Sequence, residues 1–154
     1  MKTQYRYKEA TGVTQFAIRG LKHLHKLGKI TKIIGYRYVA LYKWGPRVDD
    51  RIKVFGENGI ALFSGFGYGY SGEGPRGTIE LFKAVGVPTG TDGLYGNTPS
   101  IGDTCAYYIR RSTCGVTINK PVVDWRLELV DEKWQITHEN RLTNHEKLHH
   151  HHQG

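Results

Sequence analysis

A glycine-rich segment contains the residues of this chain that are best suited to bind a charged ligand. Residues 65–77 read GFGYGYSGEGPRG, and residues 78–85 continue with the amphipathic pattern of a short helix. A proline at the first helical position leaves the backbone N–H groups of Arg76, Gly77 and Thr78 without partners inside the helix. The helix dipole and the Arg76 guanidinium add to their attraction for an anion, so the segment predicts a site for phosphate or carboxylate.

The ligand expected at this site is a nucleotide or another small molecule that bears a phosphate, bound without catalysis. The glycines allow close approach of the backbone, Arg76 supplies charge-assisted hydrogen bonds, and a tyrosine stacks on a base or sugar. The candidate site comprises Tyr68, Tyr70, Gly72, Gly74, Arg76, Gly77 and Thr78. The same glycines are also compatible with a tight turn that lets a strand and a helix pack closely. The segment lacks the Gly-Lys-Ser/Thr ending of a P-loop, and no dinucleotide-binding βαβ pattern is evident.

Residues 66–85 resemble a small bacterial and phage domain family of unknown function. In that family a loop of the pattern Trp-Gly-Tyr-Gly-Gly-Ser-Gly-Pro precedes a helix. The matching run here, residues 66–75, reads FGYGYSGEGP and is two residues longer than the family pattern. The resemblance implies a loop followed by a helix, and it brings no activity with it.

A second candidate site follows from the uneven distribution of charge. The net charge is +8, and residues 1–54 contain 13 Lys and Arg against 3 Asp and Glu, whereas residues 55–154 contain 9 against 11. A basic half of this kind is typical of contact with RNA or DNA, because aromatic side chains stack on bases while cations neutralise phosphates. The residues of this alternative are Arg19, Lys22, Lys26, Lys29, Tyr36, Arg37, Tyr38 and Lys43. The other interpretation is that the tyrosines pack in the fold and the cations form a solvated surface.

Two helices are expected from the apolar periodicity. A three- and four-residue period predicts a helix over 12–28, with Val13 and Phe16 on its apolar face and the four cations from Arg19 to Lys29 as one opposite ridge. The second helix is expected over 75–85 and is closed by Gly86.

Strands are expected where β-branched and aromatic residues cluster. The longest, over 31–44, is ended by Gly45-Pro46, and the Asn58-Gly59 pair predicts a hairpin. A long loop is expected over 86–104. The remaining predicted strands are 52–55, 60–66, 105–111, 114–118, 122–130 and 134–139.

These elements predict a single α+β domain over residues 1–140, followed by a polar, His-rich tail over 141–154. An antiparallel sheet of about five to seven strands is expected to pack against the two short helices. The chain length suits one hydrophobic core. The sequence leaves the oligomeric state open, including a homo-oligomer.

The sequence does not decide whether the protein is an enzyme, and it favours a binding protein without cofactor, metal or assigned catalytic residues. Cys105 and Cys114 are too few for a metal site of their own. A third hypothesis is a small phosphoester-processing enzyme that uses His138 or Asp92. No run of about 20 apolar residues exists, so no membrane span is expected, and the cytoplasm is the default location.

Overall fold

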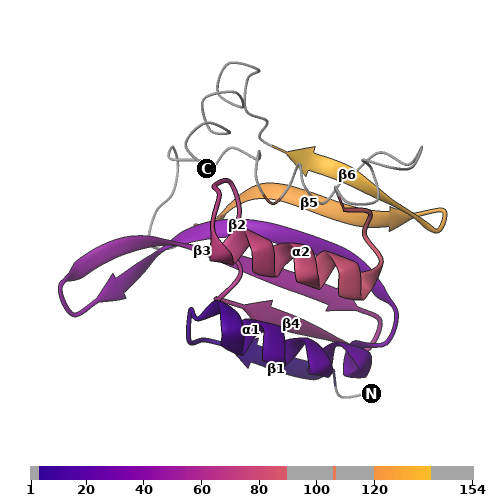
Figure 1. Cartoon of the computed structure of the whole chain (residues 1–154), viewed down its shortest axis with the longest axis horizontal. Helices are drawn as coiled ribbons and strands as arrows, with labels where there is room; N and C mark the ends of the chain where they lie inside the picture. The colour runs from indigo at the N-terminus through magenta and orange to yellow at the C-terminus, as the bar shows by residue number, and fades with distance from the viewer. Residues whose placement is uncertain (1–3, 90–105, 107–119, 140–154) are drawn as a thin grey trace.

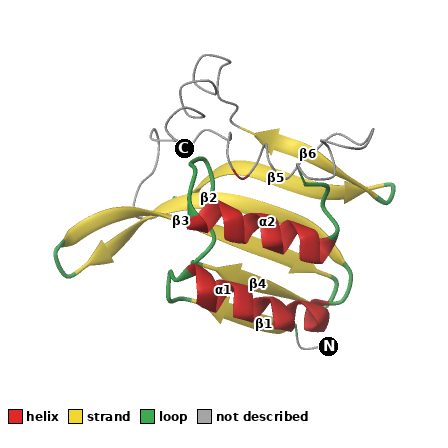
Figure 2. Ribbon diagram, in the orientation of Figure 1, coloured by secondary structure: helices red, strands yellow, loops and turns green. Residues whose placement is uncertain are grey.

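The computed structural model describes residues 4–89, 106 and 120–139. In this part of the chain, a six-stranded sheet carries helices on one of its faces (Figures 1 and 2). The expected α+β class, with five to seven strands packed against short helices, is confirmed. The elements in chain order are β1 (Tyr5–Glu9), α1 (Thr14–Gly20), the 3-10 helix η1 (Leu21–Leu27), β2 (Ile30–Tyr42), β3 (Gly45–Gly56), β4 (Gly59–Phe63), α2 (Glu73–Val85), β5 (Val122–Val130) and β6 (Lys133–Glu139).

The strand order in the sheet is β1-β4-β3-β2-β5-β6. All neighbouring strands are antiparallel except β1 and β4, which run parallel. The sequence analysis missed β1, whose residues YRYKE form an edge strand with charged side chains on one face. Tyr5 and Tyr7 point toward the helices, so Arg6 and Lys8 point to the opposite face.

The core lies between the sheet and the helices. Alternate residues of the central strands are fully buried on the helix side, and the residues between them therefore point to the other face of the sheet. Trp125 packs flat against Gly35, where a Cβ atom would collide with its ring. The buried residues of the strands and helices include Ala17, Leu27, Ile33, Ile52, Val54, Ala61, Phe63, Leu81, Phe82 and Leu127.

The helix expected over 12–28 is divided into α1 and η1. After Gly20 the helix tightens, and Leu21, Leu24 and Leu27 then recur every three residues, which is the period of a 3-10 helix. Because of this change in twist, the apolar face predicted from a single 3.6-residue period is wrong at its start. Val13 and Phe16 are 45% and 46% exposed.

The strands β2 and β3 extend beyond the rest of the sheet as a two-stranded arm, residues 38–51 (Figure 1). Among the described residues, β5 pairs with β2 only as far as Arg37, and β4 pairs with β3 only from Ile52. The strand predicted over 31–44 does end before Gly45-Pro46, but the next strand, predicted from residue 52, already begins at Gly45. Proline is tolerated at this position because it lies next to the turn, at a strand start with a free edge.

Most of the other predicted elements are confirmed, with shifted ends. The hairpin of β3 and β4 is present, although its turn residues are Glu57 and Asn58, without positive φ. Strand β5 has the predicted bounds, and Gly86 ends α2 in the left-handed conformation with φ of 94°. The predicted strands 105–111 and 114–118, and the loop from residue 90 onward, lie outside the described residues apart from position 106.

Candidate functional site

The glycine-rich segment lies beside the N-terminus of α2, but the amides predicted to be free are not free. Helix α2 begins at Glu73, two residues earlier than expected, and the Arg76 N–H donates to the Gly72 carbonyl at 3.2 Å. The prediction of unpaired amides at residues 76–78 is therefore wrong. Pro75 occupies the third helical position, where a missing N–H also costs no helical hydrogen bond.

Four of the seven predicted ligand-binding residues are buried: Tyr68, Gly74, Gly77 and Thr78. The Tyr68 hydroxyl donates to Asp124 Oδ2 at 2.8 Å, and burial followed by the charge of Asp124 raises the pKa of Tyr68 well above its usual value. Thr78 Oγ1 donates to the Gly67 carbonyl at 2.6 Å. A Cβ on Gly77 would lie 2.6 Å from Thr14 Cγ2, so Gly77 allows α1 and α2 to approach. Tyr68, Gly77 and Thr78 are therefore engaged in contacts within the protein.

The other glycines of the segment surround a tyrosine ring. Tyr70 lies against Gly67, Gly72 and Gly74, and a Cβ on Gly74 would collide with the Tyr70 hydroxyl. Arg76 is exposed on the outside of the helix. Close packing of the loop, the alternative weighed from the sequence, accounts for these contacts.

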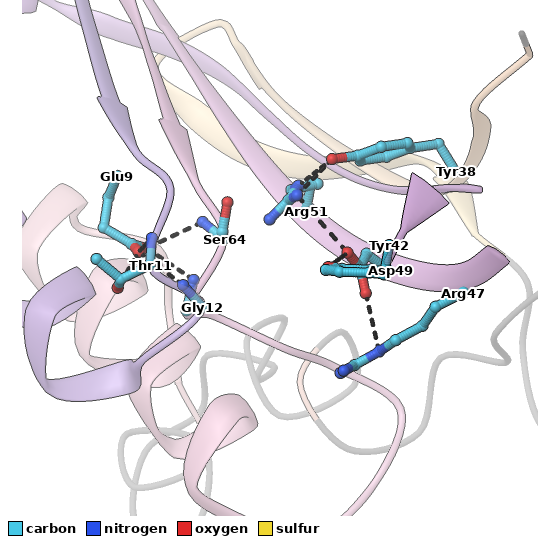
Figure 3. Close-up of polar contacts among 10 residues, drawn as sticks. Glu9, Thr11, Gly12, Tyr38, Tyr42, Arg47, Asp49, Arg51 and Ser64 are labelled. Carbon is cyan, nitrogen blue, oxygen red and sulfur yellow. Dashed lines mark hydrogen bonds and ion pairs between the residues drawn. The ribbon is translucent and has the colours of Figure 1, made fainter. Parts of the chain in front are cut away.

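A nest of backbone N–H groups does exist nearby, and the chain fills it with its own carboxylate (Figure 3). Glu9 is 4% exposed and lies at the end of β1. Its Oε2 accepts from Thr11 N at 2.7 Å, Thr11 Oγ1 at 2.6 Å and Gly12 N at 3.1 Å. Its Oε1 accepts from Ser64 N at 2.9 Å and Gly65 N at 2.7 Å. Burial alone would raise the pKa of Glu9, but these hydrogen bonds outweigh it and lower the pKa below its usual value.

A polar cleft of about 660 Å³ opens between the arm, residues 10–14 and the glycine-rich segment. Its two guanidinium groups share one carboxylate, because Arg47 and Arg51 lie 3.2 and 3.7 Å from Asp49 (Figure 3). Glu73 also lines the cleft, whereas Arg76 does not. The lining thus contains the carboxylates of Asp49, Asp50 and Glu73 beside these two guanidinium groups, and Asp50 is paired with Arg37 at 2.9 Å.

The face of the sheet opposite the helices, called here the sheet face, has a different composition. No helix of the described part of the chain covers it. Two rows of neighbouring residues cross the strands on this face. In the first row cations alternate with apolar side chains, and in the second two cations flank two apolar side chains next to a glutamate. The first row is Lys8, Leu62, Lys53, Ile34 and Arg126, and the second is Arg6, Ile60, Phe55, Lys32 and Glu128.

Cations and aromatic rings also form a continuous line along β2 and β3, called here the cation–aromatic row. Lys32 Nζ lies 4.3 Å from the centre of the Phe55 ring, and Lys53 Nζ lies 5.9 Å from Phe55 and 5.5 Å from Tyr36. The rings of Tyr36 and Tyr38 stack at 6.2 Å. The row ends at Arg51, whose guanidinium lies 5.0 Å from the Tyr38 ring and donates to the Tyr38 hydroxyl.

Four cations of the sheet face have no carboxylate within ion-pair distance among the described residues: Arg6, Lys8, Lys32 and Lys53. Arg126, by contrast, is paired with Glu128 at 3.5 Å, and Arg51 with Asp49 at 3.7 Å. Burial raises the pKa of Tyr36, which keeps this ring neutral. The sheet face thus combines neutral aromatic rings with uncompensated positive charge.

The residues predicted for nucleic-acid contact are divided between two faces. Tyr36 and Tyr38 lie on the sheet face, and Lys43 is exposed in the turn of the arm. Arg37 is 6% exposed, points to the helix side and pairs with Asp50 at 2.9 Å, so it does not lie on the surface of the two tyrosines.

The four cations predicted as one ridge belong to α1, η1 and the following turn, on the opposite side from the tyrosines. Arg19 lies 5.3 Å from the Phe16 ring, Lys26 lies 5.2 Å from the Tyr5 ring, and Lys29 pairs with Glu132 at 2.6 Å. They therefore do not form a surface shared with Tyr36 and Tyr38.

Sequence reasoning missed Lys32, Arg51, Lys53 and Phe55, which complete the cation–aromatic row. Lys32 is separated from Tyr36 and Tyr38 by an even number of residues along β2. Because side chains alternate between the faces of a strand, the sequence already placed Lys32 on the same face as these tyrosines. The residues of the row on β3 could be placed beside those of β2 only from the pairing of the two strands. That pairing was not predicted from the sequence.

The other hypotheses find little support in the described part of the chain. The His138 ring lies 3.1 Å from the Val123 carbonyl and is exposed, and Asp92 lies outside the described residues. No group of three His, Cys, Asp or Glu in the described ranges could hold a metal ion. None of the helices described is long and apolar enough to cross a membrane. Comparison with known protein families, curated proteins and solved structures gave no match.

Proposed function

We propose that this protein binds single-stranded RNA or DNA on the sheet face. The observation that carries this proposal is the cation–aromatic row, in which Phe55, Tyr36 and Tyr38 alternate with Lys32, Lys53 and Arg51. Stacking on aromatic side chains requires unpaired bases, and this favours a single strand over a duplex. The uncompensated charges of Arg6, Lys8, Lys32 and Lys53 then contact the phosphates.

The N-terminus of α2 is a weaker candidate for a phosphate. Its neighbouring amide nest is filled by Glu9, its first turn contains the negative charge of Glu73, and Arg76 lies outside the cleft. A carboxylate in the first turn already interacts with the helix dipole, so a second anion is repelled.

The proposal is tested by the salt dependence of binding. Affinity for a labelled oligothymidine of about 12 nucleotides is measured by fluorescence anisotropy at several salt concentrations. For single strands, each phosphate contact contributes about 0.7 to the slope of log K against log salt. The double variant Lys32→Ala, Lys53→Ala is therefore expected to bind less tightly and to lower the slope by about 1.4.

The matched control removes the same charge from the helix side, in the double variant Lys22→Ala, Lys26→Ala. Both lysines are exposed, so folding is expected to be unaffected. Affinity and slope close to those of the parent protein are expected. An equal loss in the two double variants would show that net charge, and not the sheet face, determines binding, and would contradict the proposal.

A further inference from the structure

The cation–aromatic row leads into the cleft. Arg51, the last residue of the row, lies 3.7 Å from Asp49, and both residues line the cleft. Tyr42 donates to the same Asp49 carboxylate, lies under the Arg47 guanidinium at 5.7 Å and stacks on Trp44 at 5.4 Å with an interplanar angle of 7°. A single strand that lies on the sheet face therefore reaches the cleft along one continuous surface.

The cleft combines paired charges with an aromatic side chain. Arg47 and Arg51 share the carboxylate of Asp49, and Asp50 is paired with Arg37. Trp44 is 78% exposed and offers a large aromatic surface on which a base can stack.

Glu73 is the carboxylate of the cleft for which the described residues provide no hydrogen-bond or ion-pair partner. A carboxylate accepts two parallel hydrogen bonds. Guanine is the base whose Watson–Crick edge presents two adjacent donors, N1–H and the N2 amino group, whereas the other bases present a donor beside an acceptor. The Ser64 hydroxyl also lines the cleft, is shielded from solvent and has no partner among the described residues.

We infer that the cleft holds one guanine base of the bound strand, stacked on Trp44 and recognised by the Glu73 carboxylate. This inference rests on the proposed binding of single strands to the sheet face and adds base specificity to it. Glu73 is then a specificity-determining residue, while the cations of the sheet face supply most of the affinity.

The test compares guanosine with inosine, whose base lacks only the N2 amino group. One of these nucleosides is placed at the first, a central or the last position of an otherwise oligothymidine strand, and affinity is measured by fluorescence anisotropy. For at least one position, the guanine strand is expected to bind about tenfold more tightly than its inosine counterpart. Glu73→Gln is expected to abolish this preference, since an amide offers a donor where the carboxylate offers an acceptor.

The matched control is Glu80→Gln, which removes the same charge from α2 outside the cleft and is expected to keep the preference. Equal binding of guanine and inosine strands at every position, or a preference that survives Glu73→Gln, would overturn the inference while leaving the proposed function intact. If none of these strands binds, the proposed function fails, and the inference fails with it.

Discussion

Glu9 is bound by backbone amides other than those expected to bind an anion. The sequence predicted an anion at the amides of Arg76, Gly77 and Thr78, whereas the amides that hold a carboxylate belong to Thr11, Gly12, Ser64 and Gly65. The anion is a side chain of the same protein. It could not be recognised because β1, which ends at Glu9, pairs with β4 over a long sequence separation that no local pattern reveals.

Replacing Glu9 by Gln is expected to lower the free energy of unfolding by about 2 to 4 kcal/mol, because an amide nitrogen then faces backbone donors that it cannot accept from. Urea denaturation followed by circular dichroism measures this change. Glu57→Gln, at an exposed position in the β3–β4 turn, is the control and should have almost no effect.

The decrease in the free energy of unfolding caused by Glu9→Gln should be larger at neutral pH than in acid. A carboxyl group whose pKa is lowered by folding stabilises the folded state above its unfolded pKa, and the contribution is lost as the pH falls through the folded pKa. The difference between parent and variant is therefore largest near neutral pH and shrinks below the usual glutamate pKa of 4.5. A difference that stays constant or grows in acid would contradict the role given to Glu9.

At the scale of elements, local patterns predicted those parts of the chain whose neighbours in sequence are also neighbours in space. Strand β5, the turn to β6 and the C-terminal end of α2 follow from alternation and from the glycine at residue 86. The arm was missed because the strand after Gly45-Pro46 was predicted to begin only at residue 52, whereas β3 begins at Gly45. The division of the first helix was missed because a leucine every three residues fits both helical periods over a short stretch.

The contact between α1 and α2 depends on Gly77. Alanine is favoured over glycine in a helix by about 1 kcal/mol, but a Cβ here would lie 2.6 Å from Thr14 Cγ2 and 2.9 Å from the Phe66 ring. Overpacking of this kind costs about 1 to 3 kcal/mol, so Gly77→Ala is expected to lower the midpoint of thermal unfolding. Arg76→Ala, at the exposed neighbouring position, should leave it unchanged or raise it slightly. A Gly77→Ala protein as stable as the parent would show that the two helices are not in close contact.

At the scale of the whole molecule, the basic half of the chain is distributed over both faces of the sheet. The cations of α1 and η1 lie on the helix side, while those of β1, β2 and β3 surround aromatic rings on the sheet face. The sequence identified Tyr36 and Tyr38 as candidates, but it could not show which face the helices cover. That information comes from the packing of both helices on the buried residues of the central strands.

The most direct test of nucleic-acid binding on the sheet face is photocrosslinking. A single-stranded oligonucleotide with a photoreactive pyrimidine is irradiated in complex with the full chain, and the modified residues are identified by mass spectrometry. Stacking on the cation–aromatic row predicts crosslinks at Tyr36, Tyr38 or Phe55. Crosslinks confined to α1, η1 or the glycine-rich segment, with none on β2 or β3, would contradict the account.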